Sequence, residues 1–149
     1  MQFNLETHPH EYTIRAYAAG QITVTLPWNA HDTAPEALDA IGPGPHGTRV
    51  KQEVITGSVI VTPTHLLRNW PPRSVPELEA GHMQALLELQ PEVVLLGSGA
   101  RLLWPAPDVL APLLEAGIGY EVMDTAAACR TYNILMGDGR RVAAALCMI

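Results

Sequence analysis

The amino-acid sequence predicts one α/β domain, in which N-terminal antiparallel hairpins and a C-terminal β-α-β-α-β succession form a mixed sheet covered by helices. Three observations support this fold class. Apolar residues alternate near the N-terminus, as in hairpins, and short apolar runs separated by helical patterns follow residue 92. The chain has 149 residues, of which 48% are hydrophobic and 16% charged, so it can bury one core and offset its ordering entropy.

The N-terminal half is predicted to contribute antiparallel strands. Apolar and polar residues alternate over residues 12–17 and again over 21–26, on either side of a glycine turn, which indicates a β-hairpin. Residues 50–55 and 59–62 have the composition of two further strands, and the proline that follows removes a hydrogen-bond donor and ends the second one.

Two segments of this half are expected to form loops. Residues 27–47 contain repeated prolines and glycines, so they can hold at most a short helix near 35–41. Residues 66–76 are too rich in proline for regular structure, whereas 78–89 have apolar residues spaced as on one face of a helix.

The last third of the chain alternates short apolar runs with helical segments. Strands this continuously apolar suit positions that are covered on both faces, and the helices between them suit crossovers between parallel strands. Asp124 or Thr125 is expected to cap the second of these helices. The predicted elements are a strand at 93–96, a helix at 107–116, a strand at 120–123, a helix ending near 136 and a strand at 142–149.

The net charge, the cysteines and the search for targeting signals limit the expected partners and the expected location of the protein. Nine lysines and arginines against fifteen acidic residues give a net charge of −6, which argues against nucleic acid as the main partner. Cys129 and Cys147 fall in apolar segments, so reduced thiols and a reducing compartment are expected. No signal peptide or membrane-length apolar run is visible, and we expect a cytoplasmic protein with no direct insertion into a membrane.

The triplet Gly97-Ser98-Gly99 is a candidate ligand-binding turn, because it follows a predicted strand at the edge where open α/β sheets bind ligands. It lacks the third glycine of a dinucleotide fingerprint, since Leu102 occupies that position. It also lacks the flanking glycines of a hydrolase elbow, since Leu96 and Ala100 stand there. We therefore predict no cofactor and no catalytic residues.

Histidines and cysteines do not suggest a reactive centre. The six histidines have no companion cysteines or carboxylates at ligand spacing, so no metal is predicted. Cys129 lies one turn into a predicted helix beside Arg130, where a reactive thiolate is conceivable. Its helical neighbours are apolar, and packing as a small hydrophobic residue is the preferred interpretation.

Polar side chains in the apolar last third form a second set of candidates. Asp124, Arg130, Asn133, Arg140 and Arg141 either form a buried network or present an arginine-rich surface to an acidic partner. The sequence leaves these two alternatives open.

The run from Met123 to Leu135, followed by the block from Gly139 to Leu146, resembles one family of small domains. This family includes mitochondrial complex I assembly factor 3, an adipogenesis-associated mammalian protein and many bacterial and archaeal proteins. Its other landmark, an apolar strand ending in Gly-Thr-Gly, reads Leu96-Gly97-Ser98-Gly99 here. The resemblance covers about residues 12–149, and eight arginines against one lysine are compatible with a bacterial member.

The resemblance implies a three-layer α/β fold and no established catalytic activity. It favours a non-enzymatic interaction or assembly factor with an unidentified protein partner, for which Arg130, Arg140 and Arg141 are candidate contacts. The rival hypothesis is a small-molecule-binding protein or enzyme that uses a pocket near Gly97-Ser98-Gly99 together with Asp124, Thr125 and Arg130. A homodimer without another partner is the third alternative.

Overall fold

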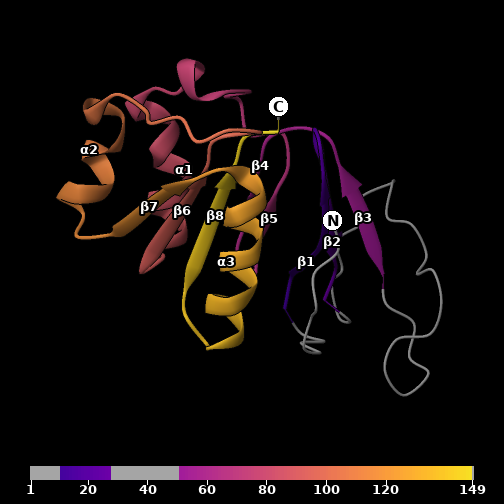
Figure 1. Ribbon diagram of the computed structural model, residues 1–149. Helices are drawn as coiled ribbons and strands as arrows, with labels where there is room; N and C mark the ends of the chain where they lie inside the picture. Colours follow the sequence, from indigo (N-terminus) through magenta and orange to yellow (C-terminus); the bar gives the residue numbers. More distant parts are fainter. Residues whose placement is uncertain (1–10, 28–50, 149) are drawn as a thin grey trace.

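The computed structural model describes residues 11–27 and 51–148 (Figure 1). Apart from residue 27, the predicted loop at 27–47 with its short helix lies outside these ranges. The elements, in chain order, are β1 (Thr13–Ala18), β2 (Gln21–Thr25), β3 (Gln52–Ile55), β4 (Val59–Val61), β5 (Leu66–Leu67), η2 (Val75–Glu77), η3 (Ala80–Met83), α1 (Gln84–Leu89), β6 (Val93–Gly97), α2 (Pro107–Glu115), β7 (Gly119–Met123), α3 (Thr125–Gly137) and β8 (Val142–Leu146).

The strands form two sheets. β1, β2 and β3 make an antiparallel sheet in that order, whereas the larger sheet has the order β5-β4-β8-β6-β7. In the larger sheet β6 runs parallel to both β7 and β8, and β4 runs antiparallel to β8 and β5. The prediction of a mixed sheet is confirmed for the five-stranded sheet, but β1, β2 and β3 do not join it as expected, and the strands on either side of Gly57 belong to different sheets.

The five-stranded sheet separates two hydrophobic cores. Figure 1 shows α3 on one face of this sheet, with the three-stranded sheet beside it, and α1 and α2 toward the opposite side. Within β8, Val142, Ala144 and Leu146 contribute to the first core, whereas Ala143 and Ala145 contribute to the second. All five side chains of β8 are buried. The expectation that this apolar strand is covered on both faces is confirmed.

Three predicted boundaries differ from the structure, and the first is β8, which ends at Leu146 although the strand was predicted to run to 149. Residues 66–76, predicted as loop, contain β5 and the short helix η2. β5 forms because Thr62 Oγ1 accepts hydrogen bonds from the amides of Thr64 and His65, and this tight turn folds the chain back on β4. The helix predicted over 78–89 begins two residues later, as the 3₁₀ turn η3, and continues as α1.

The helices of the last third lie where they were predicted. α2 begins with Pro107 at its first position, where a missing N–H costs nothing. It ends at Glu115, and Gly117, two residues later, has a φ of +73°, the left-handed conformation that glycine adopts without strain. The amide of Ile118 then donates to the carbonyl of Leu113, which satisfies one of the last carbonyls of the helix.

Side chains of α3 attach the three-stranded sheet to the rest of the molecule. The Tyr132 hydroxyl donates to the carbonyl oxygen of Tyr12 at 2.7 Å. The Asn133 amide bonds to both backbone groups of Ile14: its Oδ1 accepts from the Ile14 amide at 3.0 Å, and its Nδ2 donates to the Ile14 carbonyl at 2.7 Å. Among the described residues, the edge of β1 that faces away from β2 is thus paired with a side chain of α3 instead of another strand.

A second contact of the three-stranded sheet is a charged pair that joins β3 to the residue after β5. Glu53 of β3 is buried and accepts two hydrogen bonds from Arg68, which follows β5, at 2.6 and 2.7 Å. This bidentate geometry is the strongest form of an arginine–carboxylate pair.

No helix in the described part of the chain is long and apolar enough to cross a membrane.

Candidate functional site

The Gly97-Ser98-Gly99 turn lies at the carboxyl end of β6, beside the start of α3. The amide of Ser98 donates to the carbonyl of Met123 at 2.9 Å, and the amide of Thr125 donates to the carbonyl of Gly99 at 2.9 Å. A methyl group on Gly97 would come within 2.9 Å of both Leu146 Cδ2 and Thr125 Oγ1. Gly97 is therefore required for the close approach of α3 and β8 to this strand.

Thr125 joins the ends of three elements. Its side chain is fully buried, and its hydroxyl accepts a hydrogen bond from the Gly99 amide and donates one to the Cys147 carbonyl, both at 2.8 Å. The preceding residue, Asp124, caps α3, because its Oδ1 accepts from the amide of Ala127 at 2.8 Å. The predicted cap is confirmed at Asp124.

Ser98 shapes the loop that follows the turn. Its hydroxyl is buried, donates to the carbonyl of Arg101 at 2.6 Å and accepts from the amide of Leu103 at 3.1 Å. The hydroxyl therefore has a donor and an acceptor partner within the chain. It holds residues 99–103 in a compact bend.

Topology makes this edge the expected ligand position. The chain leaves β6 toward α2 on one side of the sheet and leaves β7 toward α3 on the other, so the two connections diverge between neighbouring strands. Open α/β sheets bind ligands at such a divergence. Here the backbone bonds from Ser98 to Met123 and from Thr125 to Gly99 bridge it. The amides of Ser98 and Gly99, which would face an anion, already have acceptors.

The three candidate arginines lie elsewhere. Arg140 and Arg141 precede β8, at the opposite edge of the sheet, where Arg140 Nε lies 3.1 Å from Glu92 Oε1 and the Arg141 amide donates to the same oxygen at 2.9 Å. The Arg141 amide first, and then Arg140, hold the pKa of Glu92 below its ordinary value. Arg130 is exposed in the middle of α3. The predicted residues therefore do not form one site. The glycine turn, Asp124 and Thr125 lie at the carboxyl ends of the parallel strands, whereas the arginines lie in α3 and at the opposite ends of the strands.

Cys129 lies inside the first core. Its side chain is fully buried, and burial raises the pKa of the thiol to about 12, against a smaller lowering by Arg130. Such a thiol is neutral at physiological pH, and only a thiolate is an effective nucleophile. The interpretation of Cys129 as a packed core residue is confirmed.

The histidines that the structure describes have structural partners. His82 Nδ1 accepts from the amide of Glu79 at 2.9 Å, and His65 Nδ1 lies 2.8 Å from the hydroxyl of Thr64. Within residues 11–27 and 51–148 no three His, Cys, Asp or Glu side chains are grouped so as to hold a metal ion. The other four histidines lie outside these ranges.

Comparison with known proteins assigns the chain to a family. The family described as protein of unknown function DUF498/DUF598 matches residues 40–147. The chain belongs to this family. The matched range contains the Met123 to Leu135 run and the Gly97-Ser98-Gly99 turn, on which the resemblance in the sequence rests.

The family includes curated relatives from animals and bacteria. A Danio rerio protein named NADH dehydrogenase [ubiquinone] 1 alpha subcomplex assembly factor 3 is 38% identical over 103 residues, 68% of this chain. The match spans 59% of that protein. An uncharacterised Rhodobacter capsulatus protein is 34% identical over 110 residues, which are 74% of this chain and 84% of its own. The resemblance to the assembly-factor family is therefore confirmed.

Solved structures of bacterial proteins have the same fold. The solution structure of a Xanthomonas campestris protein superimposes with a TM-score of 0.69 at 36% identity, and it covers 96% of this chain and 89% of its own. This agreement over almost the whole chain confirms the three-layer α/β fold that the resemblance implies.

One surface feature was not predicted from the sequence. Leu102, Leu103 and Trp104, at the end of the bend that Ser98 holds, are exposed by 53%, 44% and 64%. The available signal was three consecutive large apolar residues between a glycine turn and Pro105, in a segment without helical or strand periodicity. We call residues 102–104 the apolar segment.

Proposed function

We propose that this chain is a non-enzymatic interaction factor that assists the assembly of a protein complex. One observation carries the proposal: the polar groups at the ends of β6 and β7, where a ligand would bind, already have hydrogen-bond partners. The Thr125 hydroxyl and the backbone supply these partners. A ligand at this edge would have to break those bonds. The apolar segment beside it, in contrast, is open to a partner.

The relatives indicate which complex to test first. The vertebrate relatives carry the name of an assembly factor for NADH dehydrogenase, so subunits of the bacterial counterpart of that complex are the first candidate partners. Since the match spans little more than half of those proteins, the partner is part of the proposal. Arg130, Arg140 and Arg141 remain candidate contacts because all three side chains are exposed.

Deletion of the gene in the source organism tests the proposal. We expect less fully assembled NADH dehydrogenase on native gels, with unassembled subunits accumulating, and restoration by a plasmid that carries the wild-type gene. Unchanged amounts of the assembled complex, with growth conditions that require it, would contradict a role in its assembly.

Native mass spectrometry of the gently purified protein separates the alternatives. A ligand-free chain with a second polypeptide supports the interaction factor. A retained small molecule, displaced when Thr125 is replaced, would instead support the rival hypothesis of a binding protein near Gly97-Ser98-Gly99. A homodimer that carries nothing else would favour the third alternative.

A further inference from the structure

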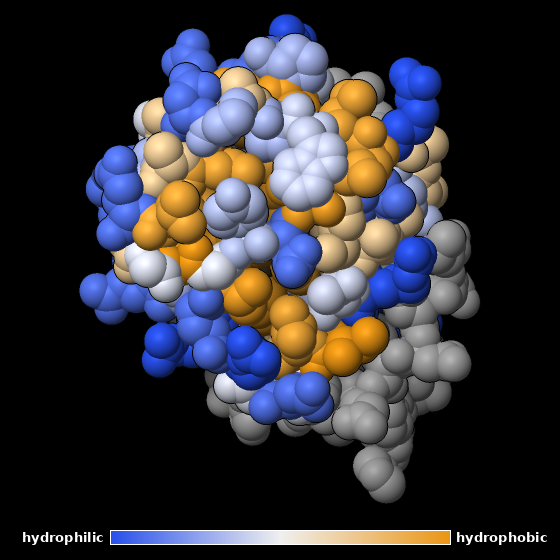
Figure 2. Space-filling model, turned by 60° about the vertical axis from the view of Figure 1, so that its left-hand side comes forward, coloured by the Kyte–Doolittle hydropathy of each residue, from blue (hydrophilic) through white to orange (hydrophobic). Residues whose placement is uncertain are grey.

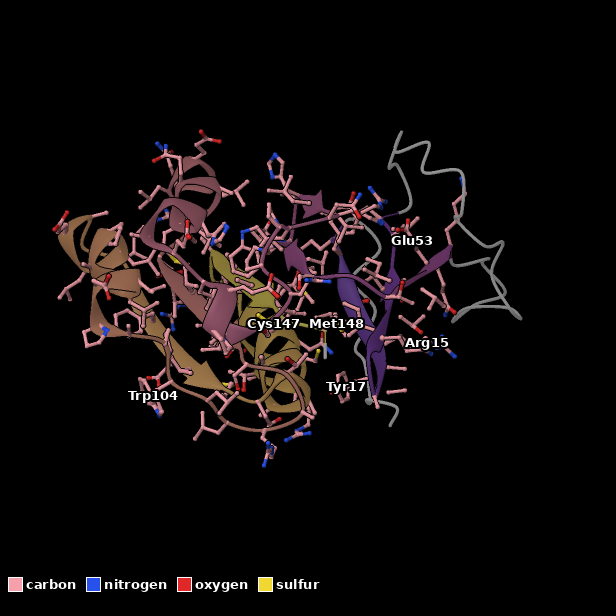
Figure 3. The ribbon with its side chains drawn as sticks, turned by 90° about the horizontal axis from the view of Figure 1, so that it is seen from above. Arg15, Tyr17, Glu53, Trp104, Cys147 and Met148 are labelled. Carbon is pink, nitrogen blue, oxygen red and sulfur yellow. The ribbon has the colours of Figure 1, made fainter. Side chains whose placement is uncertain are left out.

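The exposed large apolar residues are concentrated in one stretch of the chain. Of the six that the described residues contain, four come from the stretch between β6 and β7: the three residues of the apolar segment and Leu114 of α2. Figure 2 shows the side of the molecule that carries α2 and β7, where apolar residues reach the surface between polar ones. Figure 3 shows Trp104 at the margin of the molecule on this side, away from Cys147 and Met148.

The apolar segment is held in place at both ends. At its start, the Ser98 hydroxyl donates to the Arg101 carbonyl and accepts from the Leu103 amide. At its end, Pro105 is buried and α2 begins two residues later. The side chains are therefore presented by an ordered backbone, and a partner that binds them bears little of the entropy cost of ordering a loop. Tryptophan in such a position is the residue type that most often dominates binding energy.

The charged side chains of α2 and β7, the two elements that follow the apolar segment in the chain, are all acidic. Asp108, Glu115 and Glu121 are exposed on α2 and β7, and Arg101 is the single basic residue between residues 101 and 123. A surface with an apolar centre and an acidic border is complementary to an apolar pocket bordered by lysine or arginine.

The same charges argue against two other occupants. β7 is the last strand of its sheet among the described residues, and Glu121 is its middle residue. Two copies that paired these strands about a central two-fold axis would bring their Glu121 carboxylates together. An anionic lipid surface would repel this acidic border and a chain with a net charge of −6.

We propose that the apolar segment, Leu102-Leu103-Trp104, is a contact surface for a protein that presents an apolar pocket bordered by lysine or arginine. This inference rests on the proposed function and names the surface that carries it out. Trp104, the most exposed of the three, inserts into the pocket, and the acidic groups of α2 and β7 face its basic border.

Site-specific photocrosslinking in the source organism tests this surface. The photoreactive residue p-benzoylphenylalanine replaces Trp104 in the full chain, and in matched variants it replaces Val54 on β3 or Ile134 on α3, which are exposed apolar residues of other elements. We expect a protein crosslink at position 104 whose mapped peptide contains apolar residues next to lysine or arginine. We expect none at positions 54 and 134.

Other crosslinking results contradict the inference in distinguishable ways. A crosslink from position 104 to a second copy or to lipid would overturn it. Protein crosslinks confined to position 54 or 134 would overturn the surface but leave the proposed function intact. The lack of a protein crosslink at any of the three positions would remove the support for both.

A binding measurement with the mapped segment completes the test. The synthetic peptide is titrated against the wild-type chain and against Trp104→Ser and Ile134→Ser, with thermal unfolding used to confirm that each variant is folded. We expect Trp104→Ser to weaken binding at least tenfold and Ile134→Ser by less than twofold, and the wild-type affinity to fall as salt is added. Equal affinities for the two variants, or an affinity independent of salt, would refute the proposed surface.

Discussion

Replacement of Thr125 by valine tests whether its hydroxyl holds the carboxyl edge of the sheet together. Valine keeps the shape of threonine but removes both 2.8 Å hydrogen bonds, to the Gly99 amide and the Cys147 carbonyl. A buried N–H or C=O group without a partner costs about 1–3 kcal/mol. We therefore expect Thr125→Val to lower the free energy of unfolding by about 2–4 kcal/mol, measured by urea denaturation with tryptophan fluorescence.

Thr125→Ser is the matched control, because it keeps the hydroxyl and removes only a methyl group. We expect this variant to lose roughly 1 kcal/mol. If Thr125→Val were as stable as Thr125→Ser, the two hydrogen bonds would not be what closes this edge, and the argument that its polar groups are occupied would fail. A small molecule that bound Thr125→Ser but not Thr125→Val would return attention to a ligand there.

Three further predictions follow from the packing, the charged pair and the buried thiol. Gly97→Ala places a methyl group 2.9 Å from Thr125 Oγ1, so we expect it to lose about 1–3 kcal/mol in the same denaturation experiment. Gly81→Ala, whose added methyl group meets no atom within 4 Å, should change stability by less than about 0.5 kcal/mol. Glu53→Gln removes the carboxylate that binds the partly buried Arg68 and should lower stability by about 2 kcal/mol, whereas a loss below about 0.5 kcal/mol would show that the pair is not structural. The pKa of the Cys129 thiol rises on folding from 9.0 to about 12, so its contribution to stability is complete below about pH 9 and is lost as the pH rises toward 12. Cys129→Ala should therefore lose less stability than the wild type when the pH is raised across this range, and an identical loss in both would contradict this assignment.

The sequence predicted those parts of the fold that depend on neighbouring residues, such as apolar runs, helix caps and prolines. The continuous apolar run of β8 predicted a strand buried on both faces, and Pro107 and Asp124 marked the starts of α2 and α3. The two-residue strand β5 was missed, because two residues are too few for any periodicity. The assignment of β3 and β4 to different sheets was also not predictable, since it depends on pairing with distant strands.

The candidate site was predictable only in part, for a similar reason. Strand order placed Gly97-Ser98-Gly99 near the start of α3, because the ends of parallel strands meet at one edge of a sheet. The rotamer that directs the Thr125 hydroxyl to two backbone groups is a property of the packed structure. The pairing of Arg140 with Glu92 likewise joins residues that are distant in sequence. Arg140 lies at the amino ends of the parallel strands, away from Gly97-Ser98-Gly99.

The contact between α3 and β1 also has a consequence for the order of folding during synthesis. The Asn133 amide that pairs with Ile14 belongs to a residue 119 positions later in the chain. On the ribosome, β1 and β2 emerge long before this helix, so the nascent hairpin exposes an unpaired edge until the last third of the chain has been made. Contacts of such long range slow folding. We therefore expect chaperones that shield exposed strands to act on the nascent chain during this interval, and truncation before residue 133 to yield an aggregating product.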